Sequence, residues 1–227
     1  MKIAELFHSI QGEGLLAGAP SVFVRTSGCN LRCVWCDTPY TSWAPEGRGM
    51  TVEEIVAAVE AYSSRHVVLT GGEPMIAPEI AALTRRLREA GRHITVETAG
   101  TVFAPVECDL MSLSPKLSNS TPTDLEGGRW AERHEKLRIQ TGVLRRLMED
   151  YEHQLKFVVA DPGDLDEVRA LVRELDADSG RVLLMPEGRT PEILRERGAW
   201  LAETCVQEGF RYCPRLHVEL WGGRRGV

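Results

Sequence analysis

Three cysteines lie close together near the beginning of the chain, at Cys29, Cys33 and Cys36. Their spacing, C-x3-C-x2-C, supplies three thiolates where a cubane iron–sulfur cluster usually takes four. A cluster held in this way keeps one iron free of protein ligands, and an open metal position is where substrate chemistry takes place. The spacing therefore predicts a cluster that takes part in a reaction.

A structural zinc site and a disulfide are the two simpler explanations of these cysteines. Structural zinc takes four ligands, usually as two closely spaced pairs, whereas Cys108, Cys205 and Cys213 are scattered. Cys108 opens a hydrophobic run, and a free cysteine there is expected in the core. Six cysteines in 227 residues, with no pattern of a targeting segment at the N-terminus, do not indicate a disulfide-rich secreted protein. The cluster is the favoured interpretation.

Further chemically capable residues follow or interrupt predicted strands. The turn at 70–74, Thr-Gly-Gly-Glu-Pro, and the turn at 114–116, Ser-Pro-Lys, each come directly after an apolar run. Glycine and proline are common in turns that have no function, but active sites lie at the carboxyl ends of barrel strands. Lys156 stands inside an apolar run, so it either reaches out from a sheet edge or points into the barrel mouth at an anion, which we favour.

The elements that position these residues alternate along the chain. Apolar, β-branched runs predict strands at 21–25, 66–70, 93–98, 109–113, 154–159 and 181–185, and a seventh apolar segment spans 212–220. Helical patterns lie between them, beginning at Thr51 and covering 78–90, 144–151, 164–175 and 191–208. This alternation predicts an α/β protein with right-handed βαβ units and a parallel sheet. Six units are too few for a closed eightfold barrel and predict a partial, open, TIM-like (β/α)6 barrel.

The segment 118–138 is polar, contains Pro122, Gly127 and Gly128, and mixes both charge signs. It is long for a connection in a compact domain. It is predicted to be a flexible loop or an insertion, and no chemistry is assigned to it.

Bulk composition limits the classes of function. Hydrophobic residues make up 43% and charged residues 26% of the chain, which is ordinary for a globular protein. No apolar run approaches the roughly 18 residues of a membrane span, and a formal net charge of −6 argues against a broad nucleic-acid surface. We expect a single cytoplasmic domain, with local basic pockets for small anions still possible.

Four sequence blocks together resemble a known family. They are Phe-His-Ser-Ile-Gln-Gly-Glu-Gly at 7–14, Val-Arg-Thr-Ser-Gly-Cys at 24–29, Cys-Asp-Thr at 36–38 and the tail at 216–227. With the cysteines and the Gly-Gly-Glu-Pro turn, they resemble the 7-carboxy-7-deazaguanine synthase family of the radical S-adenosylmethionine (SAM) superfamily over the whole chain. The resemblance implies one radical SAM domain, 1–227, with a substrate-binding segment at 7–14 and a cluster loop at 28–38.

The activity implied by this resemblance is that of a carbon–nitrogen lyase in 7-deazapurine and queuosine biosynthesis. The reduced [4Fe-4S] cluster would cleave SAM to a 5′-deoxyadenosyl radical, which takes a hydrogen from 6-carboxy-5,6,7,8-tetrahydropterin. The ring then contracts with loss of ammonia to give 7-carboxy-7-deazaguanine. The resemblance also implies Mg²⁺, a homodimer and a flavodoxin- or ferredoxin-type electron donor, with neither nucleic acid nor membrane as a partner.

The resemblance assigns roles to individual residues. Cys29, Cys33 and Cys36 would bind the cluster, and Thr38 would bind Mg²⁺. SAM would be bound by Trp35, Asp37, Gly71, Gly72, Glu73, Ser114, Pro115, Lys116 and Lys156. Substrate would be bound by Ile10, Gln11, Gly12, Glu13, Arg25, Thr70 and His217. These types suit a pterin carboxylate, because an arginine can hold a carboxylate bidentately and a glutamine offers both donor and acceptor.

Two other interpretations remain at this stage. One is another small radical SAM enzyme, such as a glycyl-radical activating enzyme, which would need a protein-binding surface instead of a pterin pocket. Gln11, Glu13, Arg25 and Thr38 favour the small molecule. The other is a non-catalytic metal-binding module. One departure from the family pattern is Gly222-Gly223, where an asparagine is often found, so Gly223 is given no role.

Overall fold

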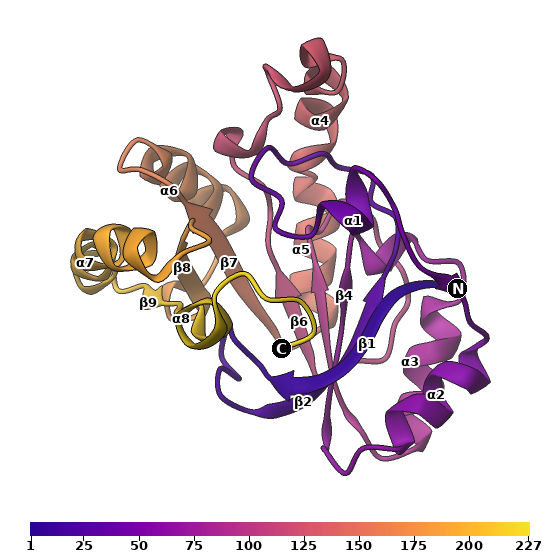
Figure 1. Cartoon of the computed structure of the whole chain (residues 1–227). Helices are drawn as coiled ribbons and strands as arrows, with labels where there is room; N and C mark the ends of the chain where they lie inside the picture. Colours follow the sequence, from indigo (N-terminus) through magenta and orange to yellow (C-terminus); the bar gives the residue numbers. More distant parts are fainter.

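One curved sheet of nine strands organises the computed structural model, which describes all 227 residues (Figure 1). Seven strands run parallel in the order β2 (Pro20–Thr26), β4 (His66–Gly71), β5 (His93–Thr98), β6 (Leu110–Leu113), β7 (His153–Val159), β8 (Val182–Pro186) and β9 (Arg211–Tyr212). Strand β1 (Lys2–Ile10) pairs antiparallel with β2, and β3 (Arg48–Gly49) pairs antiparallel with β1. Because β3 and β9 are its two edges, the sheet is not closed.

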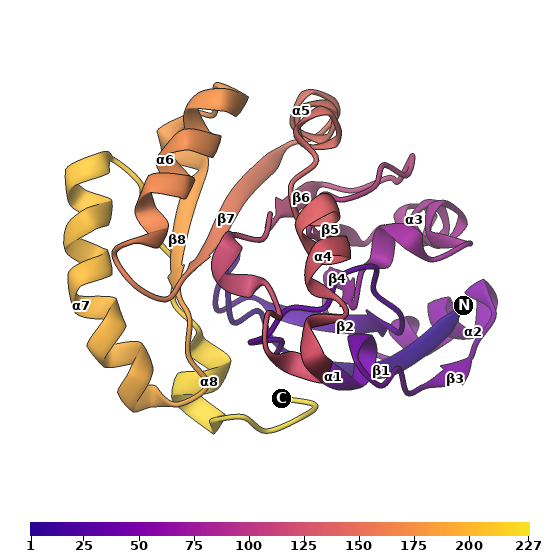
Figure 2. The same ribbon diagram turned by 90° about the horizontal axis from the view of Figure 1, so that it is seen from above.

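Helices cover the outer side of the curved sheet. They are α2 (Val52–Glu60), α3 (Ile80–Glu89), α5 (Thr141–Asp150), α6 (Asp164–Leu175) and α7 (Pro191–Glu208), which follow one another around the outside in Figure 2. A core of 33 buried residues lies between the sheet and these helices. The helix predicted from Thr51 is confirmed, and it begins with a capping box in which Thr51 accepts from the backbone of Glu54 and Glu54 accepts from that of Thr51.

The inner side of the sheet is polar because strand residues alternate between two faces. In β7, Leu155, Phe157 and Val159 belong to the outer core, whereas Lys156 and Val158 line a cavity on the inner side. Strands β4, β5 and β6 repeat this division, and their inner residues include polar side chains near the carboxyl ends. The strands are thus buried on both faces, as predicted, but the outer face is apolar whereas the inner face mixes polar side chains with a small hydrophobic cluster of Val158, Leu183, Met185 and Cys213.

The prediction of a partial, open barrel built on six parallel strands is confirmed. All six predicted strands occur, with ends shifted by no more than a few residues. Strand β1 was not predicted. Most of its residues are half-buried, so they give no clear alternation; its place is instead stabilised by pairing with β2 and by the stacked rings of Phe7 and Phe23, 4.9 Å apart.

Two irregular segments contain helices that the sequence patterns did not predict. The apolar segment 212–220 is not one continuous strand, because β9 ends at Tyr212 and the chain turns through Pro214 into the helix α8 (Leu216–Trp221). Of the two interpretations of segment 118–138, an unstructured loop is wrong, and an insertion stays a prediction. It contains 3-10 turns at Ser118–Ser120 and Leu125–Gly128 and the helix α4 (Ala131–Arg138).

The remaining short elements are α1 (Pro39–Ser42) and 3-10 turns at Pro74–Ile76 and Ser179–Arg181. No helix combines the length and the apolar character needed to span a membrane.

Candidate active site

A cavity of about 400 Å³ occupies the inner side of the sheet, at the carboxyl ends of the parallel strands. Seven arginine and lysine side chains and five carboxylates line it, although the whole chain has a formal net charge of −6. The cationic residues are Arg25, Lys116, Lys156, Arg189, Arg215, Arg224 and Arg225. A cavity with this excess of cationic groups suits anionic small molecules.

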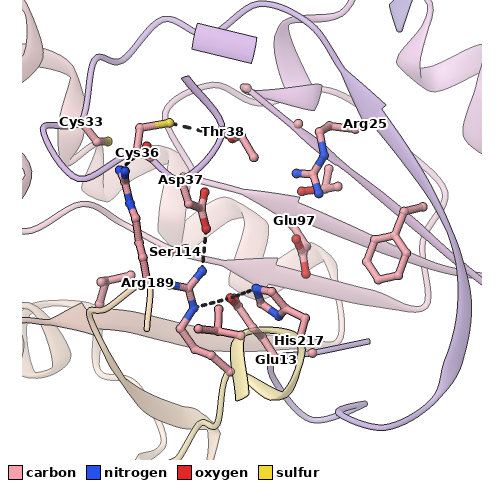
Figure 3. A pocket seen from close by; sticks show the side chains of 18 of the residues that line it. Glu13, Arg25, Cys33, Cys36, Asp37, Thr38, Glu97, Ser114, Arg189 and His217 are labelled. Atoms are coloured by element: carbon pink, nitrogen blue, oxygen red, sulfur yellow. Dashed lines mark hydrogen bonds and ion pairs between the residues drawn. The ribbon is translucent and has the colours of Figure 1, made fainter. Parts of the chain in front are cut away.

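The cluster loop follows β2 and brings all three predicted cysteines to the cavity wall. Gly28 opens the loop with φ of 114°, a conformation that glycine adopts without steric cost. The Sγ atom of Cys36 lies 3.3 Å from Oγ of Ser42, and the carbonyl oxygen of Cys36 accepts from Arg189 Nη2 at 2.6 Å. In Figure 3, Cys33 and Cys36 lie on one side of the cavity, and Glu97, Glu13 and His217 lie together on another.

The donor set fits a cluster. No three His, Cys, Asp or Glu side chains converge on one point as ligands of a single ion would, whereas a cubane takes each thiolate on a different iron. Burial raises the pKa of Cys29 and of Cys33 to about 12. Without the cluster, Cys29 and Cys33 are therefore neutral thiols at neutral pH, and ligation must displace the protons of these two groups.

The turn after β4 packs directly on the cluster loop. A β-carbon at Gly72 would lie 2.1 Å from the carbonyl oxygen of Gly28, and the backbone N–H of Glu73 donates to the same oxygen at 2.9 Å. Glycine is required here because two backbones meet. Gly71 and Gly72 line the cavity, as does Thr70.

The side chain of Glu73 faces away from the cavity. Its carboxylate accepts from Thr98 Oγ1 at 2.6 Å, from the N–H of Ala99 at 2.9 Å and from that of Met75 at 3.1 Å. Burial raises the pKa of this carboxyl group. Glu73 and Pro115 are the two predicted site residues that are not on the cavity wall; Glu73 instead joins β5 to the turn.

A buried ion network crosses the cavity floor. The Oε2 atom of Glu13 pairs with Lys156, and Oε1 accepts from Arg215 Nε at 3.0 Å. Nη2 of Arg215 also donates to Oδ2 of Asp37 at 2.6 Å (Figure 3). Burial would raise the pKa of Glu13, but Lys156 and Arg215 outweigh it and hold that pKa well below its usual range. The anion that faces Lys156 is therefore Glu13.

Beside this network, Gln11 and His217 complete a polar edge. Nε2 of Gln11 donates to Oε1 of Glu97 at 3.0 Å, and Oε1 of Gln11 accepts from the N–H of Glu13 at 3.1 Å. His217 Nε2 lies 3.9 Å from Glu13, and burial lowers the pKa of His217. A β-carbon on Gly12 would lie 2.1 Å from His217 Nδ1, so glycine lets the segment after β1 approach α8.

On a third side, Arg25 is held by a shared carboxylate. Its Nε donates to Glu5 Oε2 at 2.9 Å, leaving its two terminal nitrogens free for a ligand. Tyr40 donates to the same oxygen at 2.8 Å, and Arg225 Nε donates to Oε1 of Glu5 at 3.0 Å. The C-terminal tail, which includes Gly223, therefore forms part of the wall.

The remaining predicted residues also reach the cavity. Nζ of Lys116 donates to Ser114 Oγ at 2.8 Å and lies 5.7 Å from the centre of the Trp35 ring. Thr38 precedes α1, and its hydroxyl accepts from Thr41 Oγ1 at 3.3 Å. Ile10 lines the wall as well.

Sequence reasoning missed several wall residues, above all Arg215, Glu97, Arg189 and Glu5. The strand-end rule that found Ser114 would have found Glu97, which lies next to the end of β5. Arg215 had no such signal, because a single arginine after a proline marks no site until the chain folds.

The curved sheet with a three-cysteine loop at its carboxyl end defines a radical SAM protein. The radical SAM superfamily model matches residues 23–119. Among solved structures, QueE from Escherichia coli superposes with a TM-score of 0.71 at 26% identity, covering 95% of this chain and 94% of that one. An archaeal TYW1 structure shares the fold alone, with a TM-score of 0.55 at 14% identity, over 83% of this chain and 72% of that one.

Comparison with curated relatives identifies the family within the radical SAM superfamily. A 7-carboxy-7-deazaguanine synthase from Halobacterium salinarum is 50% identical over 97% of this chain and 90% of its own length. One from Rhodopirellula baltica is 47% identical over 99% of this chain and 88% of its own length. The chain belongs to the 7-carboxy-7-deazaguanine synthase family, and its radical SAM fold implies a [4Fe-4S] cluster and SAM.

Proposed function

We propose that this enzyme converts 6-carboxy-5,6,7,8-tetrahydropterin into 7-carboxy-7-deazaguanine, with ring contraction and loss of ammonia. The observation that carries the proposal is that one cavity contains the three cysteines, the free end of Arg25 and the polar edge formed by Gln11 and its neighbours. A bicyclic carboxylate needs both a cation and a row of donors and acceptors, and this cavity offers both within reach of the cluster loop.

Cys29, Cys33 and Cys36 hold the cluster in this proposal. When bound, the cluster and SAM supply a carbon-centred radical that abstracts a hydrogen atom from substrate. The chain's part is to orient these groups and to exclude water. Gly71 and Gly72 line the cavity and let the turn after β4 pack on the backbone of β2 and the cluster loop, and we assign SAM to this side of the cavity.

Ser114, Lys116, Trp35 and Asp37 complete the proposed SAM site, because all four line the cavity beside the cluster loop. Lys116 and Ser114, already joined by a hydrogen bond, suit the amino acid or ribose oxygens of SAM. Lys156 acts differently. Since it is paired with Glu13, it positions that carboxylate and is assigned no direct contact with SAM.

Substrate is assigned to the opposite side. The terminal nitrogens of Arg25 would hold its carboxylate in two places. Glu97, whose carboxylate accepts from Gln11, and Glu13, whose carboxylate is held by Lys156 and Arg215, would accept from the amino and ring N–H groups of the pterin. Shape and further contacts come from Ile10, Gly12, Thr70 and His217, which all line the same cavity.

Magnesium fits next to Thr38. Its hydroxyl is on the cavity wall and accepts from Thr41 Oγ1, and the half-exposed carboxylate of Asp37, the preceding residue in the sequence, is on the same cavity wall. Mg²⁺ keeps several waters and uses few protein ligands, so one hydroxyl with the substrate carboxylate is a sufficient set. We further propose a homodimer with a flavodoxin- or ferredoxin-type reductant.

The test is a matched pair of cysteine variants. Protein reconstituted without oxygen is incubated with the carboxypterin, SAM, Mg²⁺ and reductant, and the product is identified by mass and absorbance. Wild type and Cys108→Ala, whose cysteine is outside the cavity, are expected to form the deazapurine, and Cys29→Ala to form none. A wild-type protein that cleaves SAM but leaves the pterin intact would refute the proposed substrate.

A further inference from the structure

The segment 118–138, which includes α4, packs on the outer side of the cluster loop. The N–H of Val34 donates to the carbonyl oxygen of Ser120 at 2.8 Å, and Trp35 Nε1 donates to Asn119 Oδ1 at 3.1 Å. Two residues before Val34, the N–H of Arg32 donates to Nδ1 of His134 at 3.2 Å. A segment remote from the cluster loop in sequence thus satisfies polar groups at three positions around the ligating cysteines.

Arg32, between Cys29 and Cys33, is held at both ends. Its Nη1 donates to the carbonyl oxygens of Cys29 at 2.8 Å and Leu31 at 2.7 Å, which folds the side chain back over its own loop. Its guanidinium lies 4.7 Å from the ring centre of Trp130, just before α4. The same segment therefore contacts both the backbone and the side chain of this residue.

The hydrogen bonds around His134 determine its tautomer. Oγ of Ser120 donates its proton to the carbonyl oxygen of Leu117 at 2.6 Å, so it must accept from Nε2 of His134, 2.8 Å away. Nε2 therefore carries the ring proton, and Nδ1 has the lone pair that Arg32 needs. His134 is 1% exposed, so water does not replace either partner.

We propose that His134 is a positioning residue for the iron–sulfur cluster, holding Arg32 so that the flanking cysteines are ordered before iron binds. Ordering a loop costs conformational entropy, roughly 1–2 kcal/mol for each backbone residue that is fixed. Contacts with α4 order part of the loop when the protein folds, so less conformational entropy is lost when the cluster binds. The inference rests on the cluster and not on the identity of the substrate.

The test compares two substitutions at one position. His134→Phe fills the site but has no acceptor for Arg32. His134→Asn places an amide oxygen near the position of Nδ1 and can restore that acceptor. In cluster-free protein, hydrogen exchange of the Arg32 amide is expected to accelerate about tenfold in His134→Phe, the effect of losing one buried hydrogen bond, and to stay near wild type in His134→Asn.

The rate of iron release from the reconstituted proteins to a chelator is a second measurement. We expect faster release from His134→Phe than from wild type, and release near the wild-type rate from His134→Asn. Glu132→Gln, on the exposed side of α4, is the control and should change neither rate. Trp130→Leu removes the ring over Arg32 and should accelerate iron release even if His134→Phe does not fold. The proposal is overturned if the rate of iron release is unchanged in Trp130→Leu and in any folded His134→Phe. It is also overturned if hydrogen exchange accelerates evenly over the sheet.

Discussion

Gly72 and Gly28 meet backbone to backbone, because a β-carbon on Gly72 would lie 2.1 Å from the carbonyl oxygen of Gly28 and 2.8 Å from that of Thr41. Neither neighbour is the end of a flexible side chain that can move aside. We expect Gly72→Ala to displace the cluster loop, destabilise the cluster-free protein by about 1–3 kcal/mol and reduce iron content after reconstitution. Urea unfolding and iron analysis measure both.

The control for that substitution is Gly142→Ala. Nothing lies within 4 Å of a β-carbon at Gly142, which is in α5. Alanine there is expected to stabilise the helix by about 0.5–1 kcal/mol. If the two alanines have the same effect, close packing at Gly72 is not what requires glycine.

The network around Glu13 predicts a large loss of stability when its charge is removed. Glu13→Gln leaves Lys156 and Arg215 buried beside a neutral amide, and breaking a buried pair costs about 3–5 kcal/mol. Urea unfolding of cluster-free protein measures the loss. Glu152→Gln, which breaks an exposed pair with Arg181, should hardly move the midpoint, and equal midpoints for the two variants would contradict the prediction.

His134 predicts a pH dependence of folding stability. Burial lowers its pKa to about 4 from an ordinary 6.5, with Arg138 and Lys116 acting in the same direction and Glu135 opposing them. Between these values the unfolded chain binds a proton that the folded protein excludes, so this contribution is complete above pH 6.5 and falls as pH drops toward 4.

The free energy of unfolding falls by roughly 3 kcal/mol between pH 6.5 and pH 4 because of this histidine. Subtracting the unfolding free energies of His134→Asn from those of wild type at several pH values isolates it, since both proteins share all other histidines. The difference should shrink steadily below pH 6.5, and a difference independent of pH would show that the folded protein binds the proton freely.

Thr38 predicts a selective effect on metal dependence. Thr38→Ala removes a hydroxyl from the cavity wall and leaves all three cysteines in place. We expect turnover to fall and the Mg²⁺ concentration for half-maximal activity to rise about tenfold or more, since Mg²⁺ uses few protein ligands. The visible spectrum of the cluster should not change. A magnesium titration matching wild type would refute the assignment.

The parallel strands and their loops could be predicted because β-branched runs buried in a sheet have a strong sequence signal. Their carboxyl ends then placed the cluster loop and the turns at 70–74 and 114–116 at the cavity wall. Strand β1 gave a weak signal, since its residues are half-buried and it depends on pairing with β2.

The missed parts share a physical reason. Arg215 and the helix α4 act through contacts with segments remote in sequence, and neither shows a local pattern. Helix α4 is largely polar and contacts a loop through His134 rather than packing an apolar face on the core. Sequence periodicity detects apolar faces, so it did not detect this helix.

Arg215 joins residues 202 and 178 positions before it, Glu13 and Asp37. During synthesis on the ribosome, the three thiols emerge long before the guanidinium that balances these two acids. The charge balance of the cavity floor is therefore completed only after nearly the whole chain has been synthesised, so the acids and the thiols of this cavity exist for a time without their cationic partner.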